Sequence, residues 1–135
     1  MNTAIELEVS ECEFGDVRST DRLKKVATQL GQHPTHRIPA AIGDRQELDR
    51  AYEFFENAEV TAQRVLSTHR DRTIERILQQ KTCLLVQDTT EVKLTRPHQQ
   101  VKGAGPLSSN IRQGAYLHPW IAFTPSRLNL GTVWQ

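Results

Sequence analysis

A short apolar run in the second half of the chain ends abruptly in a carboxylate and two hydroxyls. The run is Cys83-Leu84-Leu85-Val86, and Gln87-Asp88-Thr89-Thr90-Glu91 follows it directly. An apolar run of about four to eight residues with polar residues on both sides is typical of a strand that is covered on both faces. We therefore predict a buried strand that presents Asp88 at its end.

The residues that follow predict further strands. Val92 to Leu94 either continues the first strand or pairs back on it, and the polar, glycine-containing segment from Arg96 to Gln113 is expected to be a long surface loop. Ala115 to Thr124 favours a strand, although Pro119 within it indicates an edge or a bulge. After a turn, Leu128 to Trp134 is expected to pair with that strand as a hairpin.

The first part of the chain predicts helices instead. From about Asp16 to Leu30, apolar residues recur at the spacing that gives a helix one apolar face. They are Leu23, Val26, Ala27 and Leu30. Gly31 would end this helix.

Two more helices are expected to follow closely. Pro39 suits the first turn of a short helix and Gly43 a tight turn after it. Asp44, with Glu47 three residues later, predicts the start of a longer helix. Its apolar face would hold Leu48, Ala51, Tyr52 and Phe55. Two helices joined through a glycine have the outline of a helix-turn-helix, an outline shared by helical hairpins that bind no DNA.

A fourth helix is predicted from Thr61, as its cap, to about Gln80. His69 lies on or near its inner side, where we expect a packed, hydrogen-bonded histidine rather than a ligand or base. The inner side would consist of Val65, Leu66, Ile74, Ile77 and Leu78.

The charge of the whole chain indicates no particular partner. Seventeen lysines and arginines against 16 aspartates and glutamates give a formal charge of +1, so any basic surface must be local. Between Val17 and Arg37 there are five cations and one anion, a local excess of +4. The cations are Arg18, Arg22, Lys24, Lys25 and Arg37. A charge run of this kind is also what an ordinary solvated helix face looks like.

Several classes of protein are disfavoured. Cys12 and Cys83 are isolated, so neither a disulfide framework nor a cysteine-based zinc site is expected. The acidic N-terminus and the lack of any run of about 18 apolar residues predict a soluble, cytoplasmic protein without a membrane partner. His33 and His36 are a poor candidate metal site, and two surface histidines are the better interpretation.

Several motifs, taken in order, together resemble the N-terminal part of DDE transposases of the insertion-sequence-four type. The main ones are Ala51-Tyr52-Glu53-Phe54-Phe55-Glu56-Asn57, Gln87-Asp88-Thr89-Thr90-Glu91 and Gly103-Ala104-Gly105-Pro106-Leu107. Further matches are Phe14-Gly15-Asp16 with Arg22, then His69, Thr73, Arg76, Gly114, His118 and Leu130-Gly131. One departure is Glu53, which stands where the family usually has an arginine and puts one DNA contact in doubt.

The resemblance implies an α+β fold in two parts. Residues 1–81 would form a helical domain that binds transposon-end DNA. Residues 82–135 would form the first three strands of an incomplete ribonuclease-H-like sheet, in which Asp88 is the first acid of the DDE triad. Without their covering helices, these strands would expose apolar faces and an unpaired edge.

The catalytic chemistry of the resembled family needs more acids than this chain offers. Two-metal phosphoryl transfer uses several carboxylates to hold Mg²⁺ or Mn²⁺. The family's second aspartate and its glutamate lie beyond the region of resemblance, and Glu91, the one acid near Asp88, is expected to be exposed. We therefore expect this chain to bind no metal stably and to cleave no DNA by itself, and whether it is an enzyme stays open.

Two functions follow from these observations. The first is binding of double-stranded transposon-end DNA, alone or as a dimer with itself or a full-length transposase. The residues expected to contact DNA are Arg18, Arg22, Lys24, Lys25, Arg37, Arg45 and Arg50. The alternative is a protein-interaction fragment that modulates a full-length transposase without binding DNA.

Overall fold

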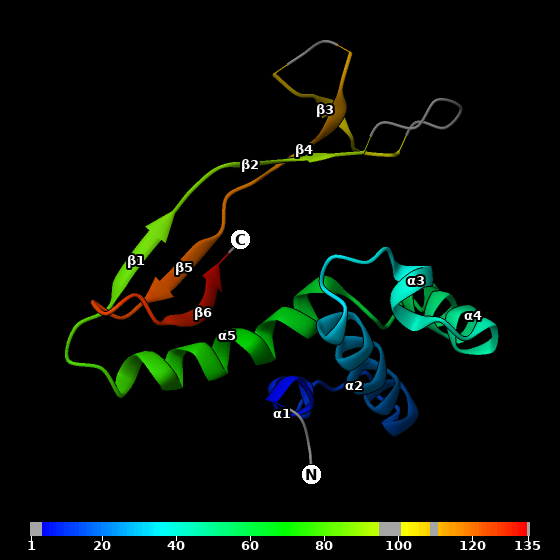
Figure 1. Ribbon diagram of the computed structural model, residues 1–135, viewed down its shortest axis with the longest axis horizontal. Helices are drawn as coiled ribbons and strands as arrows, with labels where there is room; N and C mark the ends of the chain where they lie inside the picture. The colour runs from blue at the N-terminus through cyan, green and yellow to red at the C-terminus, as the bar shows by residue number, and fades with distance from the viewer. Residues whose placement is uncertain (1–3, 95–100, 109–110, 135) are drawn as a thin grey trace. The chain divides into compact units, whose positions relative to one another are not determined.

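The computed structural model describes residues 4–94, 101–108 and 111–134, and these fall into two compact units, Met1–Arg72 and Thr73–Gln135. The first unit is helical (Figure 1). The helices are α1 (Ala4–Val9), α2 (Val17–Gln32), α3 (Ile38–Ile42), α4 (Arg45–Glu56) and α5 (Ala62–Leu78), and the end of α5 belongs to the second unit. The predicted domain boundary after residue 81 stays a prediction.

Helix α2 begins where the sequence predicts. The side chain of Asp16 caps it by accepting a hydrogen bond from the backbone N–H of Arg18, with N···O 3.1 Å. The predicted stop at Gly31 is wrong, because α2 runs on to Gln32. A Cβ at position 31 would meet the side chain of Ile5, so this glycine lets α1 pack closely against α2.

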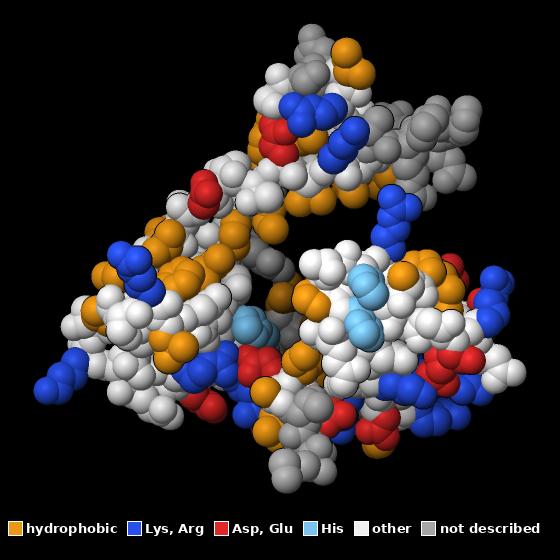
Figure 2. Space-filling view, in the orientation of Figure 1, with side chains coloured by type: hydrophobic (Ala, Val, Ile, Leu, Met, Phe, Trp, Pro, Cys, Tyr) orange, Lys and Arg blue, Asp and Glu red, His pale blue; other side chains and the backbone are white. Residues whose placement is uncertain are grey.

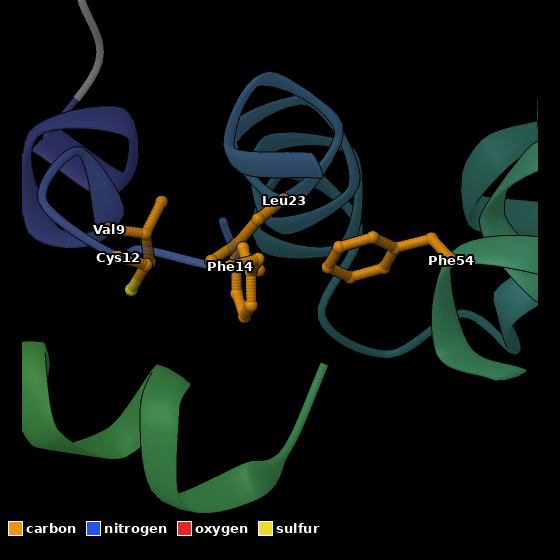
Figure 3. Packing of buried hydrophobic residues seen from close by; sticks show 5 residues of the cluster. All are labelled: Val9, Cys12, Phe14, Leu23 and Phe54. Carbon is orange, nitrogen blue, oxygen red and sulfur yellow. The ribbon is translucent and has the colours of Figure 1, made fainter. Parts of the chain in front are cut away.

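One cluster of buried side chains joins α2 and α4 to the segment after α1. It consists of Val9, Cys12, Phe14, Leu23 and Phe54 (Figure 3). The rings of Phe14 and Phe54 meet edge to face, with centroids 5.8 Å apart. These contacts fix α4 relative to α2 inside the first unit.

The predicted pair of helices around Gly43 is confirmed. Pro39 lies in the first turn of α3, and Gly43 follows it with φ +74°. The side chain of Asp44 then caps α4 by accepting from the backbone N–H of Glu47 at 2.9 Å. A second buried cluster, Val26, Ile42 and Ala51, packs the pair onto α2.

The predicted apolar face of α4 is partly wrong. Ala51 is buried and Leu48 packs beside it, but Tyr52 and Phe55 are exposed while Phe54 is buried. The reason is the position of the neighbours, because α2 and the segment containing Phe14 lie along the line through Ala51 and Phe54.

Helix α5 starts as predicted, with the hydroxyl of Thr61 accepting from the backbone N–H of Arg64 at 3.2 Å. Its predicted inner side is wrong at its C-terminal end, where Ile74 and Leu78 are exposed and Thr73 is fully buried. Strand β6 (Asn129–Trp134) accounts for this difference, because Arg76 Nε donates to the carbonyl of Leu130 at 2.6 Å. A tertiary contact therefore decides which face of α5 is covered.

The second unit contains two three-stranded antiparallel sheets among its described residues. One has the order β1-β5-β6 and the other β2-β4-β3. The remaining strands are β1 (Leu84–Gln87), β2 (Thr90–Lys93), β3 (Gly105–Pro106), β4 (Gln113–Leu117) and β5 (Trp120–Phe123). Together with the helices they confirm an α+β fold, although the described residues form six strands where three were predicted.

The two sheets share one long two-stranded ribbon. Strand β1 leads into β2 along one arm, and β4 leads into β5 along the other (Figure 1). Leu84 lies opposite Phe123 in one sheet and Lys93 lies opposite Gly114 in the other, so the pairing register is the same in both sheets. Val92 and Lys93 therefore continue the first strand, which was one of the two predicted alternatives.

The ribbon is interrupted where Asp88 and Thr89 face Pro119 and His118. Proline has no backbone N–H to donate, so a gap in the ladder is expected at Pro119. The predicted strand from Ala115 to Thr124 is thus two strands. Its predicted hairpin partner is confirmed as β6.

The prediction that the apolar run is buried on both faces is wrong. All four residues of β1 are exposed, including Leu84, Leu85 and Val86. The physical reason is that β1 makes its extensive contacts, among the described elements, with β5 alone. That strand pairs with one backbone edge of β1 and covers neither of its faces. The predicted loop from Arg96 to Gln113 contains β3, and its residues 96–100 and 109–110 lie outside the described residues.

Candidate nucleic-acid interface and the Asp88 turn

Three of the predicted DNA-contacting cations converge on one carboxylate. Glu47 Oε2 accepts from Arg22 Nη1 at 2.6 Å and pairs with Lys25 Nζ at 2.7 Å, while Glu47 Oε1 accepts from Arg50 Nη1 at 2.9 Å. Arg22 and Lys25 lie on α2, and Glu47 and Arg50 lie on α4. We call these four side chains the Glu47 cluster.

The electrostatics of the Glu47 cluster favour an ionised carboxylate. The hydrogen bond from Lys25, followed by the hydrogen bond and charge of Arg22, lowers the pKa of Glu47 from 4.5 to about 2. Three cations against one anion leave the cluster positive at neutral pH.

The other four predicted cations lie outside the cluster. Arg18 pairs with Asp16 at 3.3 Å, Lys24 with Asp21 at 3.3 Å and Arg45 with Asp49 at 3.2 Å. Arg37 is exposed and forms no ion pair in the part of the chain that the structure describes. Cations and carboxylates are therefore interspersed on the helical surface (Figure 2).

Asp88 lies in the exposed gap between β1 and β2. Its Oδ1 accepts from the backbone N–H of Thr89 at 2.7 Å, and the hydroxyl of Thr89 contacts His118 Nδ1 at 2.9 Å across the ribbon. This places the acid at the end of a strand, as predicted, but on an open surface.

The described residues do not form a metal site around Asp88. Among them, no group of three or more His, Cys, Asp or Glu side chains is placed to hold an ion. Glu91 is half-buried and otherwise engaged: Ser108 N–H donates to it at 3.2 Å and Arg112 lies 3.5 Å away. The hydrogen bonds from Ser108, with the charge of Arg112, lower the pKa of Glu91. This carboxylate of β2 is held by the segment between β3 and β4.

Residues 1–60 match the family model for the transposase DNA-binding domain. This match supports a transposase N-terminal domain and a DNA-binding role in transposition. A comparison with curated proteins finds no match. The matched range contains α1 to α4, and therefore the whole Glu47 cluster and all seven predicted cations, and it ends before Asp88.

The central position of Glu47 in the matched range was missed by sequence reasoning, which assigned Glu47 only to the start of a helix. Its spacing to Arg50 on the same helix was a usable local signal. Arg22 and Lys25 are more than twenty residues away and reach Glu47 only because α2 packs against α4. No local pattern in the sequence contains that information.

The histidines that the sequence analysis singled out lie apart from the Glu47 cluster. His33 and His36 are exposed and stack with ring centroids 5.1 Å apart. His69, just beyond the matched range, is half-buried with Nδ1 2.7 Å from Glu8 Oε1, which confirms the prediction of a hydrogen-bonded histidine.

No described helix combines the length and apolarity that crossing a membrane requires.

Proposed function

We propose that the chain binds double-stranded transposon-end DNA during cut-and-paste transposition, and that the α2–α4 surface contacts the DNA backbone. The observation that carries this proposal is the convergence of Arg22, Lys25 and Arg50 within the range that matches the transposase DNA-binding domain. Lysine and arginine contacts to phosphates supply most of the affinity of such domains.

The three cations differ in how much of each side chain is exposed to solvent, and the two more exposed ones are better placed to contact DNA. The Arg22 side chain is 24% exposed, whereas those of Lys25 and Arg50 are 50% and 53% exposed. A lysine has three N–H donors and an arginine five, so Lys25 and Arg50 keep donors for a phosphate while they contact Glu47. Arg18, Arg37 and Arg45 would extend the surface.

The proposal is tested by titrating the full chain with a transposon-end duplex at several salt concentrations. The logarithm of the affinity should fall linearly with the logarithm of salt concentration. Lys25→Ala and Arg50→Ala should each make that slope less steep, by at most about one. Lys81→Ala removes the same charge outside the matched range and is the control. An affinity that does not change with salt would contradict the proposal.

We further propose that Asp88 corresponds to the first acid of a DDE triad in a ribonuclease-H-like domain. Its position directly after β1 supports this assignment. A pair of Mg²⁺ or Mn²⁺ ions needs several carboxylates, and the described residues do not supply them. We therefore expect the purified chain to leave a supercoiled plasmid uncut in the presence of Mg²⁺ or Mn²⁺. Cutting that Asp88→Ala abolishes would contradict this expectation.

The second candidate function is a protein-interaction fragment that modulates a full-length transposase. The exposed apolar residues of β1, Leu84, Leu85 and Val86, favour it. Inhibition of a full-length transposase by protein contact should survive neutralisation of Arg18, Arg22, Lys24, Lys25 and Arg37. Inhibition by competition for DNA should be lost in the same variant.

A further inference from the structure

We propose that Glu47 is a positioning residue of the DNA interface: its carboxylate holds Lys25 and Arg50 side by side as a preformed site for one DNA phosphate. This inference rests on the proposed DNA-binding function and concerns the same surface. It assigns a positive role in DNA binding to an acid that, by simple charge, should repel DNA.

Glu47 is held both at its backbone and at its carboxylate. Its backbone N–H donates to the cap residue Asp44, and its carboxylate is held by three cations on two helices. Only 15% of the side chain is exposed. Glu47 is therefore a rigid part of the α2–α4 contact rather than a mobile surface acid.

The two outer cations approach different oxygens of Glu47. Lys25 Nζ contacts Oε2 at 2.7 Å and Arg50 Nη1 contacts Oε1 at 2.9 Å. The two nitrogens can thus be no more than about 8 Å apart, a gap that the oxygens of one phosphate group can bridge with hydrogen bonds of ordinary length.

Order in the free protein favours binding. Lysine and arginine side chains have many rotamers, and immobilising them on association costs free energy. Glu47 orders Lys25 and Arg50 before DNA arrives, so less of that cost falls on the binding step. Arg22, the most covered of the three cations, ties Glu47 to α2 and leaves the other two facing solvent.

The charge balance allows this arrangement to attract a phosphate. The cluster keeps a net positive charge with Glu47 ionised. Solvent and salt weaken the repulsion between Glu47 and a phosphate that lies beyond its two partners. The ordering effect and the charge effect predict opposite results when the carboxylate is neutralised, and that opposition makes the proposal testable.

The test compares Glu47→Gln with Glu56→Gln in the full chain. Both substitutions remove one negative charge from α4, but Glu56 is exposed and has no ion pair among the described residues. The probe is a random-sequence duplex of about three helical turns, and its affinity is measured by fluorescence anisotropy over a range of salt concentrations. Circular dichroism melting of each variant reports folding.

We expect Glu47→Gln to bind the duplex about tenfold more weakly at about 0.1 M salt, with an unchanged salt slope, because both cations remain and only their ordering before binding is lost. Glu56→Gln should bind as well as or slightly better than the unsubstituted chain, with an unchanged slope.

Two outcomes would overturn the inference. One is a Glu47→Gln variant that binds as tightly as the unsubstituted chain or more tightly, because charge alone then explains its effect. The other is a loss of affinity no larger than the unfolded fraction that circular dichroism gives for Glu47→Gln at the assay temperature, because unfolding then accounts for the whole loss. Failure of the unsubstituted chain to bind with any salt dependence would instead reject the proposed function itself.

Discussion

Glu47 shows how one side chain can hold two helices together and also set the charge of a surface. Arg22 and Lys25 reach it from α2, and Arg50 reaches it from its own helix. Exposed ion pairs usually contribute little to stability, but several charges on one mostly covered carboxylate form a network. The contribution of this network should be visible in its dependence on pH.

The first prediction concerns acid. The pKa of Glu47 is lowered from 4.5 to about 2 in the folded chain, so the unfolded chain binds the proton more tightly. The stabilisation is then fully present above about pH 4.5 and is lost as the pH falls towards about 2. Glu47→Gln should lower the melting temperature at pH 7, and the difference from the unsubstituted chain should shrink by pH 3. A difference that stays constant with pH would contradict the assigned cause.

Gly131 is a second residue whose surroundings decide which side chain can stand at its position. Its φ is +129°, a conformation that other residues rarely adopt, and a Cβ there would meet the hydroxyl of Thr73 and the guanidinium of Arg76. The absence of a side chain allows the end of α5 to lie directly against β6.

The second prediction follows from that close contact. Gly131→Ala should destabilise the second unit by about 1 to 3 kcal/mol, the usual cost of forcing an extra carbon into a packed site. The matched control is Gly105→Ala, because Gly105 has an ordinary φ and open space around it. Urea unfolding followed by tryptophan fluorescence reports on this unit, which contains Trp120 and Trp134. Equal effects of the two substitutions would count against the described contact.

At the level of the helices, starts were predictable and faces were less so. Asp44 and Thr61 were recognisable as caps because a cap acts within three residues of its position, and the helix expected from about Asp16 begins at Val17. The buried face of α4 depends on where α2 and Phe14 lie, which nearby sequence does not encode. Periodicity therefore identified a helix but selected Phe55 instead of Phe54.

The third prediction separates these two phenylalanines. Phe54 is 6% exposed and packs on Phe14, whereas Phe55, the next residue of α4, is 44% exposed. Phe54→Ala should cost about 3 to 5 kcal/mol of stability, the usual range for a buried ring. Phe55→Ala should cost far less. Thermal unfolding followed by the helical circular dichroism signal would compare the two losses of stability. A larger loss for Phe55→Ala would mean that Phe55 lies on the buried face, as periodicity predicted.

For the whole chain, the distribution of charge along the sequence was more predictable than the geometry of any site. Up to residue 82 there are 12 basic and 14 acidic residues, and after it 5 basic and 2 acidic residues. The family match covers residues 1–60, in the more acidic part, so the proposed DNA contact depends on the local cluster rather than on the net charge. The arrangement of Arg22, Lys25 and Arg50 around one acid required tertiary contacts that no sequence pattern gives. The role of Asp88 in catalysis stays a prediction.

The exposed strand β1 gives the last prediction. Leu84 and Val86 share one face of the ribbon with their cross-strand partners Phe123 and Ile121, and none of the described strands pairs with the other edge of β1. Open edges and exposed apolar faces promote association between chains. The unsubstituted chain should therefore self-associate as its concentration rises, and Val86→Lys should reduce this by placing a charge on the apolar face.

Gln87→Lys is the matched control for that last prediction, because it adds the same charge to the opposite face of the same strand. Sedimentation velocity without DNA, over a range of protein concentrations, would measure the change. If association depends on the apolar face, Val86→Lys should shift the chain towards the monomer more strongly than Gln87→Lys does. Equal shifts would mean that net charge, or the backbone edge that both variants retain, controls association. In that case the apolar face would not be the surface through which the chains meet.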